Sequence, residues 1–173
     1  MSEVRRWLQN PWLVLAAEVT LGVTFILAAL PKITDPPAFA HMIYNYRMLP
    51  GSLVNILALF LPWLELFAGA ALVLGIWRRP AGIAVTVLLL VFVAAIGFNL
   101  ARGHAVDCGC FDVRSAGKGR EELLRDMWWV LLRDVGMLLL TAISLASSFH
   151  EPRRRWPLAR MRKLPAPASP GTA

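Results

Sequence analysis

Apolar residues gather into four long runs that are separated by shorter polar segments. The runs cover residues 12–30, 53–77, 81–101 and 128–149. Each is close to the roughly 20 residues that an α-helix needs to cross the hydrocarbon core of a bilayer. The pattern predicts an all-α fold, an integral membrane four-helix bundle in one domain, residues 1–150, with no room for a separate soluble domain.

The first run is expected to stay in the mature protein rather than to serve as a removable signal peptide. It is long, it carries Glu18, and no small-x-small cleavage site precedes Pro31 and Lys32. The composition agrees with a membrane protein, because 57% of the residues are hydrophobic and only 17% are charged. Membrane lipid is therefore the first expected partner.

The distribution of Lys and Arg predicts the orientation. The amino end, the connection between the second and third runs, and the tail together hold ten, whereas the other two connections hold seven. Because positive residues favour the cytoplasmic side, both termini are expected there, in a multi-pass protein of the inner or plasma membrane. The connection between the third and fourth runs then faces the extracytoplasmic side.

Residues 151–173 form a distinct tail. Six basic residues lie between Arg153 and Lys163 without an acidic residue among them, and they account for most of the net charge of +7. We expect a disordered cytoplasmic tail, rich in Pro and Ala, whose basic part meets anionic lipid headgroups. Nucleic acid is not an expected partner, because nothing else in the chain resembles a recognition module.

Both cysteines of the chain lie in the run Asp107-Cys108-Gly109-Cys110-Phe111, between the third and fourth apolar runs. Residues two apart lie about 5 to 7 Å apart, which meets the Cα separation of a disulfide, and Gly109 can adopt the positive φ that relieves the bend. Such a bond is strained and easily reduced, and an extracytoplasmic location sustains thiol oxidation. The run predicts a redox-active thiol pair.

Neighbouring charges bear on that chemistry and leave two alternatives open. Arg102 and His104 favour the thiolate, whereas Asp107 opposes it. His104, Cys108 and Cys110 are also a soft ligand set for Cu(I) or zinc, although their spacing does not match a closed four-ligand zinc site. In a third interpretation the protein is a non-catalytic membrane assembly factor, and the two cysteines only staple a loop.

Four ionisable residues lie inside the apolar runs, where charge is costly and usually faces the bundle interior or a wet cavity. They are Glu18, Glu65, Arg133 and Asp134. From their distances to the run ends, Glu18 and Glu65 are expected at nearly the same depth, and the favoured ion pair is Glu65 with Arg133. The alternative is a polar clasp of Glu65, Arg133 and Asp134 that joins the second and fourth helices.

Three further features concern packing. Pro62 is expected to kink the second helix and to open a pocket beside Glu65. Gly69, Gly75 and Gly82 are expected at close helix contacts. Between the first two runs, Phe39, Met42, Ile43 and Tyr46 follow helical spacing. They predict a short amphipathic helix that either roofs the bundle near the cysteines or simply anchors it at the interface.

Several ordered motifs resemble the MauE branch of the DoxX-like membrane proteins. The resemblance runs from about Trp12 to the end of the fourth helix, and it rests on the strings Lys32-Ile33-x-Asp35-Pro36, Phe39-Ala40, Tyr46-Arg47-Met48-Leu49-Pro50, Leu61-Pro62-Trp63-Leu64-Glu65-Leu66 and Asp107-Cys108-Gly109-Cys110-Phe111. It implies a four-helix redox-associated membrane protein. It links the chain to methylamine utilisation, through maturation of the disulfide-rich, periplasmic small subunit of methylamine dehydrogenase.

Transferred to this chain, the resemblance places thiol–disulfide exchange at Cys108 and Cys110, with Asp107, Gly109 and Phe111 as supporting residues. Related DoxX proteins imply quinone as an electron acceptor, for which Glu65, Pro62 and Trp63 are the expected site. The partner is then an extracytoplasmic client or thiol-redox protein. With only two cysteines per chain, any further resolving thiol comes from that partner or from a second copy of the chain.

A membrane-impermeant maleimide added to intact cells is expected to label Cys108 and Cys110 only after treatment with a mild reductant. The reason is that an exposed extracytoplasmic pair is held as a reducible disulfide. The mass shift of the protein measures the labelling. Immediate labelling would instead indicate free thiols and favour metal binding, and labelling that requires an opened membrane would contradict the topology.

Overall fold

The computed structural model describes residues 10–104 and 119–150, apart from the side chains of Pro11 and residues 147–150. These residues form five helices: α2 (Pro11–Thr34), α3 (Pro36–Asn45), α4 (Gly51–Leu74), α5 (Arg78–Ala101) and α6 (Arg120–His150). All except α3 are long and apolar enough to cross a membrane. The predicted all-α membrane fold is confirmed, whereas the Cys-Gly-Cys run and the tail of residues 151–173 lie outside the described residues.

Two helices are longer than the apolar runs that predicted them, because each includes polar residues beyond the end of its run. α2 continues past Pro31 to Thr34, since a proline inside a membrane helix removes one backbone hydrogen bond without ending the helix. α6 begins at Arg120, eight residues before the predicted start, with Glu121 and Glu122 in its first turn. Acidic residues there interact favourably with the positive end of the helix dipole, so a polar segment extends the helix.

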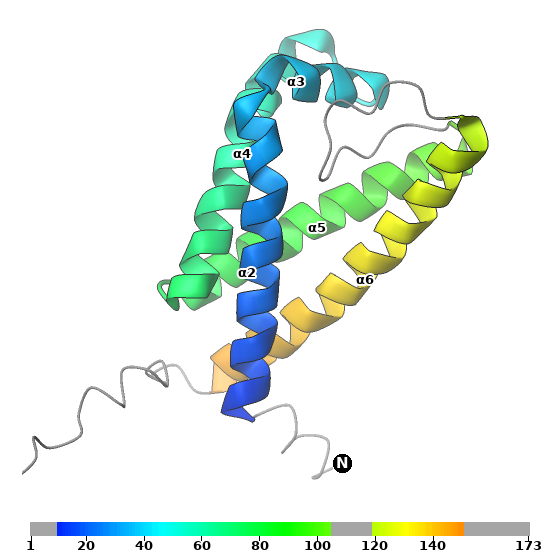
Figure 1. Ribbon diagram of the computed structural model, residues 1–173. Coiled ribbons are helices and arrows are strands. Elements are labelled where there is room, and N and C mark those ends of the chain that lie inside the picture. The colour runs from blue at the N-terminus through cyan, green and yellow to red at the C-terminus, as the bar shows by residue number, and fades with distance from the viewer. Residues whose placement is uncertain (1–9, 105–118, 151–173) are drawn as a thin grey trace, which may run out of the picture.

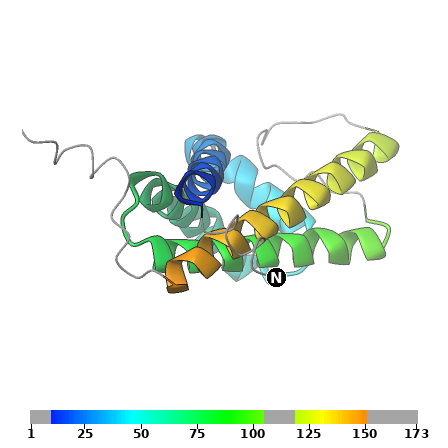
Figure 2. The ribbon, with the colours of Figure 1, turned by 90° about the horizontal axis from the view of Figure 1, so that it is seen from below.

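The membrane-spanning helices form two antiparallel pairs (Figure 1). α2 lies along α4, and α5 lies along α6; the contacts within these pairs exceed those between them. α5 and α6 lean away from α2 and α4 toward the end that carries α3. The view from below shows α6 crossing over α5 while α2 and α4 lie to one side (Figure 2). We call the end with α3 the α3 end and the opposite end the Trp77 end.

The α2–α4 pair is held at a very close backbone approach between Gly22 and Gly69. A Cβ atom added to Gly69 would lie 2.7 Å from the Gly22 carbonyl oxygen, and one added to Gly22 would lie 2.6 Å from the Gly69 carbonyl oxygen. No side chain fits there, so glycine is required at both positions. The expectation of close packing at Gly69 is confirmed, and the contact fixes the register of the two helices.

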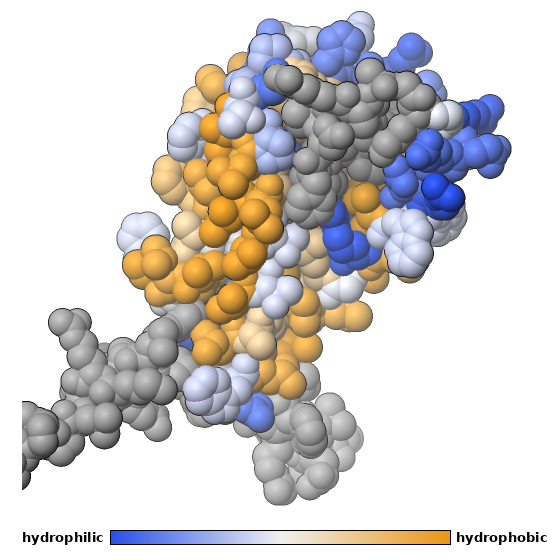
Figure 3. Space-filling view, in the orientation of Figure 1, coloured by the Kyte–Doolittle hydropathy of each residue, from blue (hydrophilic) through white to orange (hydrophobic). Residues whose placement is uncertain are grey.

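The apolar core lies where the two pairs meet. It contains residues from α2, α4, α5 and α6, among them Leu21, Phe25, Leu72, Val85 and Met137. Large apolar side chains also cover much of the outside, and the hydropathy surface shows them over α2 and α4 while hydrophilic residues gather near the α3 end (Figure 3). Such an apolar exterior is expected for a protein whose solvent is lipid.

α3 confirms the predicted amphipathic helix. Its first turn is capped by Asp35, whose carboxylate accepts a hydrogen bond of 3.2 Å from the backbone N–H of Ala38. Phe39 and Met42 are buried against Ala58 of α4, whereas His41 and Asn45 are exposed. The helix therefore covers α4 with its apolar side.

Gly75 has a different role from the one expected. It has φ +67° and ends α4: its N–H donates to the Leu72 carbonyl, and the N–H of Ile76 donates to that of Ala71. α5 begins at Arg78, so only three residues join the two pairs. The positive φ of this turn, rather than a close helix contact, explains the glycine.

Replacing Gly69 with Ala is expected to lower the free energy of unfolding by about 1 to 3 kcal/mol, because the new methyl group overlaps the Gly22 carbonyl. Gly97→Ala in α5 is the matched control, since no atom lies within 4 Å of an added Cβ there. Unfolding in detergent, followed by circular dichroism, measures both. Equal stability of the two variants would contradict the close approach.

Candidate functional site

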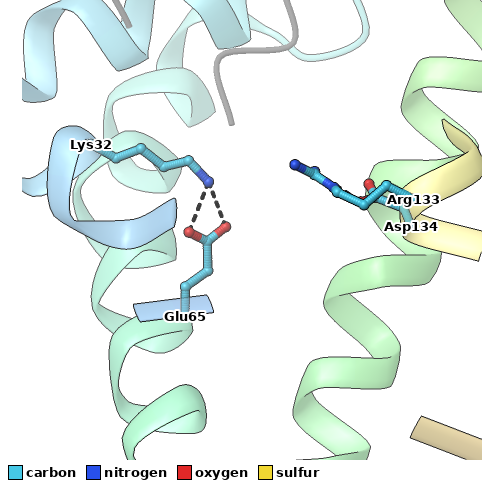
Figure 4. A network of polar contacts seen from close by, with 4 residues as sticks. All are labelled: Lys32, Glu65, Arg133 and Asp134. Carbon is cyan, nitrogen blue, oxygen red and sulfur yellow. Dashed lines mark hydrogen bonds and ion pairs between the residues drawn. The ribbon is translucent and has the colours of Figure 1, made fainter. Parts of the chain in front are cut away.

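A buried ion pair joins α2 to α4 in the half of the bundle near the α3 end. Lys32 Nζ donates to Glu65 Oε1 and to Glu65 Oε2, each at 2.8 Å, and both side chains are only 2% exposed (Figure 4). The ammonium also lies 5.1 Å from the ring centre of Phe39 and 5.0 Å from that of Phe92. Aromatic faces attract cations, so the rings of α3 and α5 complete its surroundings.

A second pair lies on α6 and faces the first. Arg133 donates from Nε and Nη2 to Asp134 Oδ1 at 3.0 and 2.9 Å. Asp134 is buried, whereas the Arg133 side chain is 31% exposed. Figure 4 shows the guanidinium extending from α6 toward Lys32 and Glu65. We call Lys32, Glu65, Arg133 and Asp134 the polar centre.

The predicted pair of Glu65 with Arg133 is wrong. Glu65 is bonded to Lys32, and Arg133 is bonded to its neighbour Asp134. The first apolar run ends at residue 30, two residues before Lys32. Because α2 continues past Pro31, the long lysine side chain can extend back along the bundle to Glu65.

Glu18 belongs to a separate polar contact near the Trp77 end. Its Oε1 accepts hydrogen bonds from Arg78 Nε at 2.9 Å, Arg78 Nη2 at 2.5 Å and Ser144 Oγ at 2.8 Å. The carboxylate is fully buried and joins α2 to α5 and α6. These bonds stabilise the junction of the two pairs with a compensated charge.

The expectation that Glu18 and Glu65 lie at one depth is also wrong. The contact between Gly22 and Gly69 sets the register of α2 against α4. Glu18 lies four residues toward the Trp77 end from this contact, and Glu65 lies four residues toward the α3 end, which separates them by roughly 12 Å along the bundle. The two acids therefore serve two different sites.

The residues expected to surround a quinone do not share one face. Pro62 and Glu65 are buried, but Trp63 is 44% exposed, and its ring lies 6.1 Å from that of Phe67 on the outside of α4. Glu65 is already held by Lys32. These side chains do not fit a common quinone site, and no electron transfer step is assigned to them.

The described residues that flank the cysteine run meet at the α3 end. Arg120, the first residue of α6, donates from Nη2 to the Gly103 carbonyl oxygen at 3.2 Å. His104 is exposed, and its backbone N–H donates to the Asn99 carbonyl at 2.9 Å. The guanidinium of Arg102 lies over the ring of Phe98. The described residues on the two sides of the cysteine run therefore lie close together.

The predicted residues Asp107, Cys108, Gly109, Cys110 and Phe111 lie outside the described residues. Of the alternative metal ligands, only His104 falls inside. Among residues 10–104 and 119–150, no three His, Cys, Asp or Glu side chains gather in a way that could hold a metal ion. The thiol pair and the metal alternative stay predictions.

Comparison with known proteins gives the family. The profile of the family described as methylamine utilisation protein MauE matches residues 10–147. The chain belongs to the MauE family. MauE family membership confirms the resemblance inferred from the sequence motifs, and the match covers all four membrane-spanning helices up to residue 147 of α6.

Several matching curated relatives carry the name methylamine utilization protein MauE. The one from Paracoccus denitrificans is 35% identical over 141 residues, which cover 81% of this chain and 70% of the relative. That from Methylorubrum extorquens is 36% identical over 120 residues, 69% of this chain and 60% of the relative. The relative from Paracoccus versutus is 34% identical over 149 residues, which cover 86% of this chain and 75% of the relative. No solved structure matches this chain.

Three residues that take part in these buried contacts were missed in the sequence of this MauE protein: Lys32, Arg78 and Ser144. Lys32 and Arg78 lie at the ends of apolar runs, where a basic residue usually marks the membrane surface. One signal for Lys32 was present, since it lies within a MauE-like motif and is followed by the Asp35 cap of α3. The sequence held no such signal for Ser144, because a serine in a membrane helix often donates a hydrogen bond to a backbone carbonyl of the same helix.

The Lys32–Glu65 pair of this MauE protein is expected to behave as a unit. Lys32→Met leaves a buried carboxylate without its partner and is expected to lower the free energy of unfolding by about 3 to 5 kcal/mol. The double variant Lys32→Met, Glu65→Leu is expected to lower the free energy of unfolding much less, since no charge is left unpaired. Detergent unfolding followed by tryptophan fluorescence measures the coupling, with Arg125→Met on the exposed side of α6 as the control. The pairing would be contradicted if the double variant lost as much free energy of unfolding as the two single variants, Lys32→Met and Glu65→Leu, lose together.

Proposed function

We propose that this protein is a membrane thiol-redox protein of methylamine utilisation, which exchanges electrons between Cys108 and Cys110 and an extracytoplasmic client. Membership of the MauE family and the names of the relatives support the pathway. The observation that supports the redox part is a contact between the described residues that flank the cysteine run. At the α3 end, Arg120 Nη2 donates to the Gly103 carbonyl oxygen.

The exchange proceeds through a mixed disulfide. A client thiolate attacks one sulfur of the oxidised Cys108–Cys110 pair, and the other cysteine leaves as a thiolate. A second client thiolate then attacks the client sulfur of the mixed disulfide and displaces the first cysteine. The client gains one disulfide and gives up two electrons, and the pair ends as a dithiol. Run in reverse, the same steps reduce a client disulfide.

The proposed orientation puts this chemistry outside the cytoplasm. The positive residues Arg78 and Arg79 begin α5 at the Trp77 end, and the basic tail follows α6, which ends there too. Positive residues favour the cytoplasmic side. The α3 end, and with it the cysteine segment, is then extracytoplasmic, where client thiols are oxidised.

The resemblance supplies the client. The small subunit of methylamine dehydrogenase is periplasmic and rich in disulfides, so its maturation needs cysteines to pair correctly. The family resemblance links MauE proteins to that step, and the α3 end is the surface that such a client meets. A membrane assembly factor without redox turnover is the competing interpretation, and the two differ in whether the thiols are needed.

A Cys108→Ser, Cys110→Ser double variant is expected to abolish disulfide formation in the small subunit. The measurement uses a methylamine-utilising host without its own copy of the protein, and alkylation with a thiol reagent reports the client's oxidation state by mass. Each single variant is expected to abolish it as well, because one remaining cysteine cannot form the internal disulfide that accepts the two electrons of the client.

The control for this experiment is His104→Ala, which keeps both thiols and is expected to mature the client normally. Helical content and membrane level of each variant, compared with the unaltered chain, confirm folding. Normal client disulfides in the double variant would overturn the redox function and favour the assembly factor. A loss with His104→Ala that added copper restores would favour the metal interpretation instead.

A further inference from the structure

The outward side of α6 carries an open groove near the α3 end. The groove has a volume of about 460 Å³ and is lined by Glu121, Leu124, Arg125, Trp128, Trp129 and Leu132. These residues recur every three or four positions, so they form one stripe along the helix. None of them belongs to the polar centre or to the buried contact of Glu18.

The stripe faces away from the bundle. The buried residues in this part of α6, Met127 and Asp134, lie on the opposite side of the helix, whereas Trp128, Trp129 and Leu132 are each more than half exposed. Among the described residues, only those of α6 line the groove. Its occupant therefore comes from the surroundings of the helix, and in a membrane these are lipid.

The stripe crosses the level of the membrane surface. Five of the seven residues from 120 to 126 are charged, whereas between residues 127 and 146 only Arg133 and Asp134 are charged. Tryptophan favours the boundary between the lipid headgroups and the hydrocarbon, and Trp128 and Trp129 lie where the composition changes. The groove thus extends from the headgroup level, at its charged end, to the acyl chains beside Leu132.

The charged end of the groove holds one negative and one positive side chain. Glu121 and Arg125 are four residues apart, about 6 Å along the helix axis, with the carboxylate on the aqueous side. Residues at this spacing can form an ion pair. Within residues 10–104 and 119–150, however, neither side chain takes part in an ion pair or a hydrogen bond. Both charges are therefore open to a ligand.

We propose that this groove binds a phospholipid whose headgroup carries a phosphate and a primary ammonium, as in phosphatidylethanolamine. The Arg125 guanidinium donates to the phosphate oxygens, and the ammonium donates to the Glu121 carboxylate. Trp128 and Trp129 flank the glycerol and ester groups, and Leu132 packs against an acyl chain. Acidic, basic, aromatic and aliphatic residues follow one another along α6 in the order of ammonium, phosphate, glycerol and acyl chain in the lipid.

Other phospholipids match only part of the groove. A phosphatidylglycerol offers its phosphate to Arg125 but brings no cation to Glu121, whose charge repels an anionic headgroup. A phosphatidylcholine brings a cation, but its quaternary ammonium has no N–H to donate to the carboxylate. The charge-assisted hydrogen bond at Glu121 is thus the basis of selectivity.

This lipid site is independent of the proposed thiol exchange. It uses neither cysteine, and it concerns the level of the headgroups rather than the compartment that they face. Its test can therefore fail while the redox function holds, and the reverse.

The test measures lipid binding to the purified full-length chain in detergent by native mass spectrometry. Phosphatidylethanolamine, phosphatidylcholine and phosphatidylglycerol with identical acyl chains are titrated separately, and the fraction of chains that retains one lipid gives an apparent Kd. The unaltered chain is expected to bind phosphatidylethanolamine about tenfold more tightly than either of the others, because only that lipid satisfies both charges. Free phosphoethanolamine is expected not to compete, because it has no acyl chain for Leu132; competition at the same concentration would overturn the assignment of a lipid.

Two variants separate the two ends of the headgroup. Glu121→Gln is expected to lower the affinity for phosphatidylethanolamine to that for phosphatidylcholine. Arg125→Gln is expected to weaken the binding of all three lipids about tenfold, because the phosphate is common to them. Glu122→Gln and Arg47→Gln are the matched controls, since each makes the same change of charge at an exposed position outside the groove. All four positions are exposed, so circular dichroism is expected to show an unchanged fold.

Two sets of results would contradict the proposal. Equal or weaker binding of phosphatidylethanolamine than of the other lipids, or a preference that Glu121→Gln leaves unchanged, would overturn the assignment of the ammonium to Glu121. Phosphatidylethanolamine binding that Arg125→Gln leaves unchanged, or that the controls weaken as much, would overturn the site itself.

Discussion

The half of the bundle near the α3 end depends on the burial of Lys32 against Glu65. This pair joins the last turn of α2 to the middle of α4, and the ammonium is also in contact with rings from α3 and α5. A buried charge without a partner is expensive in any protein and more so in a membrane. Four helices therefore have to keep their relative positions for this one cation to remain compensated.

The close approach of Gly22 and Gly69 makes that pairing geometrically available. It brings the backbones of α2 and α4 together one turn from Glu65 and sets the register that places Glu65 within reach of Lys32. The same register leaves Glu18 to the other helix pair, where Arg78 and Ser144 compensate it. Two glycines without side chains thus determine which charges meet.

Much of this architecture was predictable from the sequence, because long apolar runs leave little choice of fold in a membrane. The amphipathic spacing from Phe39 to Tyr46 similarly identified α3. The ion pairs were not predictable in the same way. Lys32 lies beyond the end of the first apolar run, although its aliphatic stem allows it to lie inside the span. Helical spacing does not indicate that Arg133 folds back onto the adjacent Asp134. Partners across helices depend on register, which a single sequence does not reveal.

The three-residue turn that joins α4 to α5 has a practical consequence. Gly75 and Trp77 both have positive φ, and helices begin or end directly beside them. Such a short turn cannot extend, so an inserted reporter domain or epitope would separate the end of α4 from the start of α5. The chain is therefore poorly suited to being divided there into two co-expressed halves.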